Sequence, residues 1–343
     1  MQLHLLCPGL LWPAKALYDS ARDLELPALS RLLGRGRQRW QEALALEDWH
    51  CLSNASAGVS APAAPLRLLG EGLDPGNSVW MCADPSHFAF EQGRLILGGQ
   101  SLQIDTEEMD SLLDALQPCL AALPGFIRLC PGAAGSGLAY LQLAAPPALA
   151  TTPPSAARGL SVHHNLPRGE QARAWTQVIN DAQMILHALP LNRRREAAGL
   201  PLINTLWLWG AGSLPPAPPA AYSVVLGSDA LLRGLARWSS VEVQPLPAAA
   251  DQLPRRGAIL ACVDDLAAAT QALDANLWRE TLLRLEHDWF APLAAAYFSG
   301  RLRRLRLTAF GPESTLDLEF GLGDRYRFWR RARPLTGLLP PGP

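Results

Sequence analysis

Residues 192–212 hold the side chains that could bind a charged ligand. The segment reads NRRREAAGLPLINTLWLWGAG. An asparagine and an arginine cluster come first, an apolar predicted strand follows, and a Gly-Ala-Gly turn is predicted at its end. Guanidinium and amide groups suit phosphate and carboxylate ligands, and ligands of open α/β sheets bind beyond the carboxyl ends of strands. The segment predicts a site for a small phosphorylated or otherwise anionic ligand. The structural alternative is an ordinary core strand ended by a glycine turn.

Several short motifs carry a family resemblance. The central ones are Leu189-Pro190-Leu191-Asn192, Arg195, Gly199-Leu200-Pro201, Asn204 and Trp207-Leu208-Trp209-Gly210-Ala211-Gly212. Weaker ones are Ala83-Asp84-Pro85-Ser86-His87 with Gly93-Arg94-Leu95, Leu166-Pro167-Arg168-Gly169 with Trp175, and Trp289-Phe290-Ala291-Pro292-Leu293 with Trp329-Arg330-Arg331. Together they resemble the archaeal-type, cofactor-independent phosphoglycerate mutases of the alkaline phosphatase superfamily. They are still more similar to a bacterial branch known as phosphoglycerate-mutase-like, or as regulatory protein E of the rpf cluster.

The resemblance implies a set of ligand-binding residues. They are Asn192, Arg195, Asn204, Trp207, Trp209, Gly210 and Gly212, together with Asp84 and His87. Asp84 and His87 are included because they begin the predicted inserted domain and could face a cleft between lobes, a common place for ligands. The structural alternatives are an ion pair between Arg195 and Glu196 that fixes the loop, and bonds from Asn204 to backbone groups.

The resemblance also implies a reaction centre with two metal ions and a Ser or Thr nucleophile. Paired hard cations need several carboxylates and histidines at strand ends. The first strand continues Leu6-Cys7-Pro8-Gly9-Leu10, and a later one continues Leu307-Thr308-Ala309-Phe310, so neither supplies such a ligand. Asp264-Asp265 occupies an expected position, but alanines follow it, and a helix N-cap is the alternative. We therefore predict no metal, no cofactor and no catalytic residue of that kind.

Other constellations favour structural roles. The glycine-rich residues 132–137 lack the Lys-Ser/Thr of a phosphate loop. His163 and His164, placed on a strand, would point to opposite faces. Glu286-His287-Asp288 and the arginines 301, 303, 304 and 306 are interpreted as solvated.

Composition excludes several protein classes. The 343 residues are 49% hydrophobic and 18% charged with a net charge of −1, which is typical of a globular protein that does not bind nucleic acid nonspecifically. The six cysteines show no zinc-finger or CxxC spacing, as expected for reduced thiols in a cytoplasmic protein. No apolar run reaches membrane-spanning length. We predict a cytoplasmic protein with no membrane partner.

Strands that alternate with helices predict an α/β fold with a mostly parallel sheet and helices on both faces. Predicted strands cover residues 3–7, 79–82, 94–97, 126–129, 138–143, 160–163, 205–209, 222–226, 258–263, 302–307 and 315–320. Predicted helices cover 14–33 with a break at Pro27, 35–46, 105–123, 169–189, 228–235 and 275–298, and residues 53–65 are a predicted loop. The resemblance makes this a reduced alkaline-phosphatase-like core, 1–77 and 166–335, with an inserted α+β domain, 78–165, and a tail, 336–343.

These observations favour a phosphoglycerate-mutase-like protein that has lost the two-metal site and keeps a ligand-binding or regulatory role. The regulatory role comes from the bacterial branch alone. The alternative is a divergent phosphoglycerate mutase or phosphohydrolase that acts on a small phosphorylated metabolite. A protein partner is a third expectation, because a tryptophan-rich surface would mediate oligomerisation.

Overall fold

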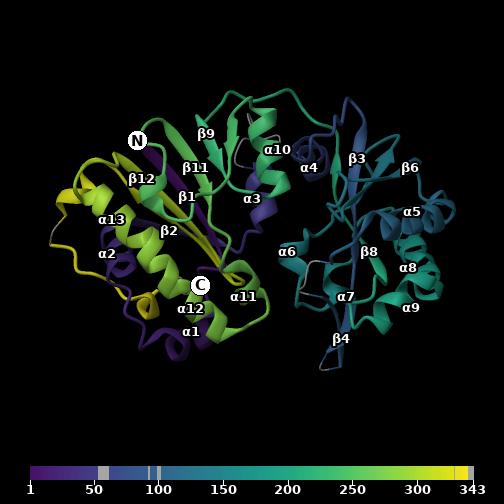
Figure 1. Ribbon diagram of the computed structural model, residues 1–343, viewed down its shortest axis with the longest axis horizontal. Coiled ribbons are helices and arrows are strands. Elements are labelled where there is room, and N and C mark those ends of the chain that lie inside the picture. Colours follow the sequence, from purple (N-terminus) through teal and green to yellow (C-terminus); the bar gives the residue numbers. More distant parts are fainter. Residues whose placement is uncertain (53–61, 92, 99–101, 328, 339–343) are drawn as a thin grey trace. The chain divides into compact units, whose positions relative to one another are not determined.

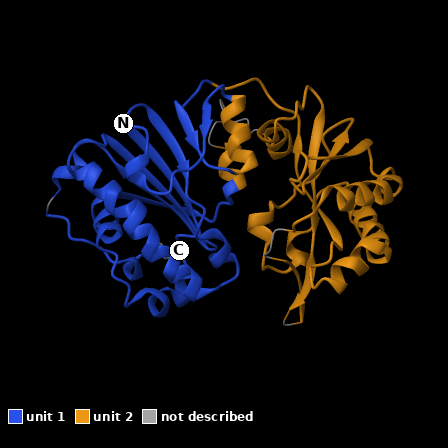
Figure 2. Cartoon of the chain, viewed as in Figure 1, with its two compact units in different colours: residues 1–46, 219–228, 239–343 blue, residues 47–218, 229–238 orange. Residues whose placement is uncertain are grey.

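The computed structural model describes residues 1–52, 62–91, 93–98, 102–327 and 329–338. The chain forms two compact units (Figure 2). The first unit contains residues 1–46, 219–228 and 239–343, and the second contains 47–218 and 229–238. The chain therefore crosses between the units at 46/47, 218/219, 228/229 and 238/239. The second unit extends beyond the predicted insertion, 78–165, and includes the whole segment 192–212.

A seven-stranded sheet forms the centre of the first unit (Figure 1), in the order β10-β9-β11-β1-β12-β13-β2. Its strands are β1 (Gln2–Pro8), β2 (Arg37–Glu42), β9 (Val224–Leu226), β10 (Glu242–Gln244), β11 (Ala258–Cys262), β12 (Arg304–Phe310) and β13 (Ser314–Phe320). The strands from β10 to β12 run parallel, whereas β13 and β2 are antiparallel additions at one edge. The predicted mostly parallel sheet is confirmed.

Helices pack on the face of this sheet to which Leu3, Leu5 and Cys7 point. They are α1 (Ala14–Ala21), α2 (Pro27–Arg35), α11 (Ala267–Gln271), α12 (Ala275–Leu285), the π-turn η3 (Glu286–Phe290) and α13 (Ala291–Phe298), with short turns η2 (Ala250–Gln252), η4 (Asp324–Tyr326) and η5 (Leu335–Gly337). The helix predicted over 275–298 is thus interrupted at η3, directly before the turn that holds Pro292. Proline cannot donate the hydrogen bond that a continuous α-helix requires there.

Glu286 is buried, so its predicted solvated position is wrong. Its carboxylate accepts hydrogen bonds from the backbone N–H groups of Ala28 at 2.6 Å and Leu29 at 3.0 Å. These groups belong to the first turn of α2, whose N–H groups have no partner within the helix. The negative charge also lies at the positive end of the helix dipole. A side chain distant in sequence therefore caps α2.

A hydrogen-bonded polar chain crosses the first unit's sheet at His4. The hydroxyl of Thr308 donates to Asp317 Oδ1 at 2.5 Å, so its oxygen must accept from His4 Nε2, 2.8 Å away. The proton of the His4 ring is therefore on Nε2. His4 Nδ1 is then an acceptor, and the Tyr222 hydroxyl, 2.8 Å away, donates to it.

Acid is expected to destabilise the protein through His4. Burial, reinforced by Arg306, lowers the pKa of His4 from 6.5 to about 3. The unfolded chain therefore binds the extra proton between about pH 6.5 and pH 3, while the folded chain does not. The free energy of unfolding should fall with decreasing pH across this window by up to about 1.4 kcal/mol per pH unit. Urea denaturation at pH 7, 6 and 5 measures this slope.

The control for this slope is an exposed histidine. His4→Gln should reduce the slope, and His187→Gln, on an exposed part of the second unit, should leave it unchanged. Part of the slope will survive in His4→Gln, because burial also lowers the pKa of His50 to about 4. Equal slopes in the wild type and His4→Gln would contradict the expectation.

A four-stranded antiparallel sheet, β6-β7-β3-β8, forms the second unit. Its strands are β3 (Val79–Ser86), β6 (Phe126–Pro131), β7 (Ala139–Leu143) and β8 (Thr205–Gly212), and β4 (Phe88–Glu91) pairs with β5 (Arg94–Leu97) beside it. The helices are α3 (Leu46–Leu52), α4 (Ala63–Glu71), α5 (Thr106–Leu120), α6 (Pro154–Ala157), α7 (Val162–Asn165), α8 (Ala172–Ala188), α9 (Pro190–Ala197) and α10 (Ala230–Trp238). Helices α5 and α8 share one core with this sheet.

Helices α4 and α10 touch backbone to backbone in the second unit. A Cβ atom on Gly70 would lie 1.6 Å from the Ala230 carbonyl oxygen, and one on Gly234 would lie 1.7 Å from the Leu66 oxygen. Only glycine permits this approach. Two glycines from distant parts of the sequence therefore fix α10 within this unit.

Several other local predictions differ from the structure. Residues 37–42 form the edge strand β2 and not a helix, because they pair with β13. Residues 162–165 form the helical turn α7 and not a strand. The predicted loop 53–65 lies outside the described residues up to 61, and α4 begins at Ala63. The expected tryptophan-rich surface is wrong, since Trp12, Trp49, Trp80, Trp175, Trp207, Trp209, Trp238, Trp278 and Trp289 are buried.

Two expectations on cysteines and membranes can be compared with the structure. All six cysteines are free, and Cys7, Cys82 and Cys262 are buried. Among the described residues, every helix is too short or too polar to cross a bilayer.

Candidate functional site

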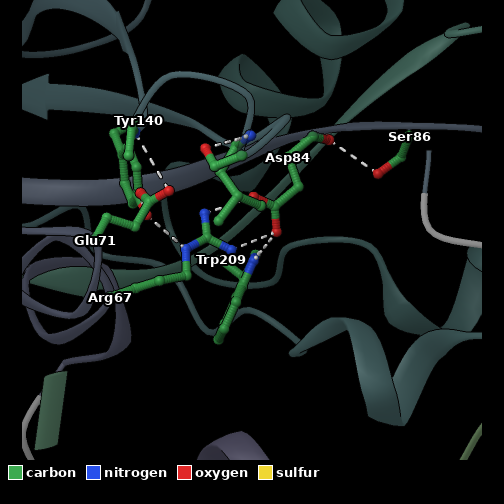
Figure 3. Close-up of polar contacts among 9 residues, drawn as sticks. Arg67, Glu71, Asp84, Ser86, Tyr140 and Trp209 are labelled. Atoms are coloured by element: carbon green, nitrogen blue, oxygen red, sulfur yellow. Dashed lines mark hydrogen bonds and ion pairs between the residues drawn. The ribbon is translucent and has the colours of Figure 1, made fainter. Parts of the chain in front are cut away.

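The pairing of β3 with β8 brings predicted site residues together. In the antiparallel register Asp84 lies opposite Trp207, and Cys82 lies opposite Trp209. Strand β3 is apolar and buried from Val79 to Ala83, so Asp84 is a charged residue at the end of a buried run. Figure 3 shows the side chains that meet Asp84.

Arg67 of α4 and Asp84 form a bidentate ion pair. Arg67 Nη1 donates to Asp84 Oδ2 at 2.9 Å, and Nη2 donates to Oδ1 at 2.5 Å. The indole N–H of Trp209 donates to Oδ2 at 2.7 Å (Figure 3). Only 7% of the Arg67 side chain and 13% of the Asp84 side chain are exposed. Two charges removed from water need such complete hydrogen bonding to be tolerated.

Tyr140 and Glu71 extend this polar centre. Arg67 Nε donates to the Tyr140 hydroxyl at 2.9 Å, and that hydroxyl donates to Glu71 Oε2 at 2.5 Å (Figure 3). The guanidinium also lies 4.7 Å from the centre of the Tyr140 ring and 5.4 Å from that of Trp209, within the range of cation–π attraction. Four elements, α4, β3, β7 and β8, are thereby joined at one arginine.

Electrostatics favours the charged form of Arg67. Burial alone would lower its pKa, but the carboxylate of Asp84 outweighs this and raises the pKa well above the usual value. Burial raises the pKa of Tyr140, which keeps its hydroxyl protonated as a donor. Arg67 therefore holds neighbouring elements together through a buried ion pair, and its donors are not open to an external anion.

The Gly-Ala-Gly sequence lies within β8 and not in the predicted turn. Gly210 has a φ of 67°, and a Cβ atom there would lie 2.8 Å from Ala63 Cβ; a Cβ on Gly212 would lie 2.7 Å from Pro62. These glycines therefore allow the start of α4 to approach the strand. The indole N–H of Trp207 donates to the Thr152 carbonyl at 2.8 Å.

Asn192 and Arg195 hold the loop between α9 and β8. Asn192 is buried, donates to the carbonyls of Leu186 and Ile203, and accepts from the N–H of Ile203. Arg195 is 2% exposed and donates to the Pro201 carbonyl at 2.7 Å and to Glu108 at 2.8 Å. The ion-pair partner is thus Glu108 of α5, and the predicted pair with Glu196 is wrong.

Asn204 and His87 fasten the start of the β4 hairpin. The Asn204 amide accepts from the N–H of Phe88 at 2.7 Å and donates to its carbonyl at 2.9 Å. This confirms the expectation that Asn204 bonds backbone groups. His87 Nδ1 lies 2.8 Å from the Leu202 carbonyl oxygen and therefore donates to it.

The structure brings Asp84 and Trp209 into contact, and it spreads the other predicted residues along α9, β8 and the β4 hairpin. Their polar side-chain groups contact the fold itself, and ligand binding by this set stays a prediction. Sequence reasoning missed Arg67, Tyr140 and Glu71. One signal was available, since Arg67 interrupts the apolar run Pro65-Leu66-Arg67-Leu68-Leu69.

Apolar packing closes the carboxyl end of β1, where a two-metal site would begin. The carbonyl of Gly9 accepts from the Thr270 hydroxyl at 2.8 Å and from the Trp278 indole at 2.9 Å. Trp12 is buried and lies 5.0 Å from the Trp278 ring. Burial also raises the pKa of the Cys7 thiol. Side chains at this strand end are therefore protonated or apolar.

The remaining candidates for metal binding have other roles. Asp265 pairs with Arg284 at 2.8 Å. Helix α11 has Leu266 as its N-cap without a side-chain bond, so the N-cap expected at Asp264-Asp265 is wrong. His163 and His164 lie on α7 with their rings 5.6 Å apart. In the part of the chain that the structure describes, no three His, Cys, Asp or Glu residues are grouped to hold a metal ion.

Comparison with known proteins identifies relatives. No family model matches the chain. It is 30% identical over 148 residues to the 2,3-bisphosphoglycerate-independent phosphoglycerate mutase of Methanothrix thermoacetophila. The aligned residues make up 41% of this chain and 36% of the relative. It is 28% identical over 156 residues to a probable enzyme of the same name from Geobacter sulfurreducens, 44% of this chain and 38% of the relative. The matches thus span little more than a third of these relatives' length.

A solved structure shows a similar fold. The PH0037 protein from Pyrococcus horikoshii superposes with a TM-score of 0.56 at 17% identity, over 98% of this chain and 91% of that one. The fold similarity is independent of the sequence matches, which identify the kind of protein that the chain resembles. Over about two fifths of its length, the chain is similar in sequence to 2,3-bisphosphoglycerate-independent phosphoglycerate mutases.

Proposed function

We propose that this protein is a non-catalytic phosphoglycerate-mutase-like protein that serves in ligand binding or regulation. The observation that carries the proposal is the closed carboxyl end of β1. Two hard divalent cations need oxygen and imidazole ligands that converge from strand ends. Here Trp12 and Trp278 pack together, and the Gly9 carbonyl is already bonded.

The neighbouring strand supports the same proposal. Thr308 of β12 lies where a metal ligand would be expected from the resemblance, and its hydroxyl is shared between His4 and Asp317. Asp317 also accepts from Arg306 and Gln41, each at 2.8 Å. This carboxylate is 2% exposed and is neutralised by the groups around it. Asp317 is therefore committed to hydrogen bonds with Thr308, Arg306 and Gln41 within the sheet.

Metal content and turnover test this proposal. The purified protein is dialysed with Mn²⁺ and Mg²⁺, its bound metal is measured by mass spectrometry, and phosphoglycerate mutase activity is assayed. We expect substoichiometric metal and no turnover above the buffer rate. The mutase of Methanothrix thermoacetophila, treated identically, is the positive control for the assay. Two bound metal ions per chain together with turnover would reject the proposal.

The segment 192–212 is assigned a supporting role in the same proposal. Asn192 and Arg195 hold a loop, and Trp209 belongs to the buried centre at Arg67. Binding of a small phosphorylated ligand, and regulation as in the rpf-cluster branch, are proposed from the sequence resemblance. Titration with 3-phosphoglycerate, followed by calorimetry, tests the binding.

A divergent phosphoglycerate mutase or phosphohydrolase is the second candidate. The 30% identity to a mutase is the observation that favours it. It predicts turnover of at least one member of a broad phosphate-ester panel. Arg195→Ala is a poor probe of this activity, because Arg195 is buried and bonded to Glu108, so its loss would also destabilise the fold. If the folded protein turns over no member of the panel, this candidate function is contradicted.

A further inference from the structure

A cavity lies at the amino ends of the first unit's parallel strands, opposite the ends where ligands of α/β sheets usually bind. Its volume is about 610 Å³, within the usual range for small-molecule sites. The polar residues that line it include Gln2 and His4 of β1, Arg304 and Arg306 of β12, Arg37 of β2, and Tyr222. It belongs to one unit only.

Three arginines line the cavity. Arg37, Arg304 and Arg306 face one carboxylate in the lining, that of Glu319. Arg37 lies 3.5 Å from Asp324, and Arg306 donates through Nη2 to Asp317 at 2.8 Å. Arg304 is exposed. Two of the three guanidinium groups are thus paired with carboxylates. Arg304 forms no ion pair within the described residues, so its guanidinium is the one best placed to take up a phosphate or carboxylate.

The guanidinium of Arg306 is only partly hydrogen-bonded. Its Nε atom is buried and makes no hydrogen bond to any residue that the structure describes, although its Nη2 is bonded to Asp317. A buried unsatisfied N–H costs about 1–3 kcal/mol, so such groups usually have a ligand or water as partner. The Nε–H itself is covered by its neighbours, so what Arg306 offers to the cavity is the rest of its side chain, of which 42% is exposed.

Tyr222 offers the cavity a hydrogen-bond acceptor, whereas the arginines offer donors. Its proton is committed to His4 Nδ1, as the direction of the Thr308 bond requires. The phenolic oxygen therefore offers only lone pairs to the cavity. This oxygen can accept a hydrogen bond from a ligand hydroxyl, but it repels a bare anion. Tyr222 would therefore bind a hydroxyl group of the ligand, whereas the arginines would bind its acidic group.

We propose that this cavity binds a small hydroxylated anion, with its acidic group on Arg304 and Arg306 and a hydroxyl group on Tyr222. The site is independent of the proposed function, because it lies at the other ends of β1 and β12. Glycerol 2-phosphate carries both features, and isopropyl phosphate is the matched probe without hydroxyl groups.

Calorimetric titration of both probes at low ionic strength tests the proposal on the full chain. The wild type should bind glycerol 2-phosphate more tightly than isopropyl phosphate. Arg304→Ala should weaken both probes about tenfold, the loss expected for one charge-assisted hydrogen bond. Arg303→Ala is the control, because Arg303 is exposed, adjacent and outside the cavity lining. It should bind like the wild type.

Tyr222→Phe separates the two parts of the site. It should lower the affinity for glycerol 2-phosphate and leave that for isopropyl phosphate unchanged, with circular dichroism confirming that the variant is folded. If it unfolds, the comparison of Arg304→Ala with Arg303→Ala decides. Equal affinities in these two arginine variants, or no binding to the wild type at millimolar probe, would overturn the proposal.

Discussion

Arg67→Ala is expected to lower the free energy of unfolding by about 3–5 kcal/mol, the usual cost of removing one partner from a buried ion pair. The variant leaves the Asp84 carboxylate buried without its two guanidinium bonds. It also removes the donor to Tyr140 and the cation between two aromatic rings. Urea denaturation followed by tryptophan fluorescence measures the loss.

Two further variants make this result specific to the ion pair. Arg173→Ala, an exposed arginine on α8, should change the stability by less than about 0.5 kcal/mol. The double variant Arg67→Leu/Asp84→Leu should lose less than the sum of its single changes, because no uncompensated charge is left behind. An Arg67→Ala protein as stable as Arg173→Ala would show that the pair contributes nothing.

Gly234→Ala is the second change with a large expected effect, a loss of about 3 kcal/mol or more. The new methyl group would lie 1.7 Å from the carbonyl oxygen of Leu66, which is helix backbone and cannot rotate away. Helices α4 and α10 must then separate, and the contacts around them loosen. Thermal unfolding followed by circular dichroism should show a clearly lower midpoint.

Gly323→Ala is the matched control, since a Cβ atom there meets nothing within 4 Å and φ is −84°. It should leave the midpoint nearly unchanged. Gly70→Ala should resemble Gly234→Ala, and the double variant should cost less than the sum, because one separation of the helices accommodates both methyl groups. A Gly234→Ala midpoint equal to that of Gly323→Ala would refute the close packing.

Periodicity in the sequence was sufficient to predict the parallel sheet of the first unit. Strand β1 is buried on both faces and mostly apolar, and the helix around Trp278 repeats its apolar residues with helical spacing. Such signals are local, and burial of these faces selects the element. Strands β9, β11 and β12 follow the same pattern, so their order in the chain predicts a parallel arrangement.

Non-local pairing explains most of the failures. The segment Arg37–Glu42 has no strong strand signal, and β13 makes it a strand by pairing along its whole length. The strand β8 was predicted correctly, but its neighbour is the antiparallel β3 and not a parallel strand of the first unit. A sequence pattern states which face of a strand is apolar, and it does not state which strand lies beside it.

The candidate site shows the same division. Asn192, Arg195 and Asn204 have the right donors for an anion, and the sequence cannot show that backbone carbonyls and Glu108 already accept from them. Arg67 went unnoticed because a single arginine on a helix is usually solvated. Its burial depends on Asp84 and Tyr140, which come from two other elements.

The position of α10 has a consequence for synthesis of the protein. Helix α4 leaves the ribosome long before α10, and its glycine surface at Gly70 has no packing partner until then. The second unit therefore cannot complete its fold while translation stops short of residue 238. A nascent chain truncated before that point carries an unfinished hydrophobic surface, the kind that chaperones bind and proteases clear.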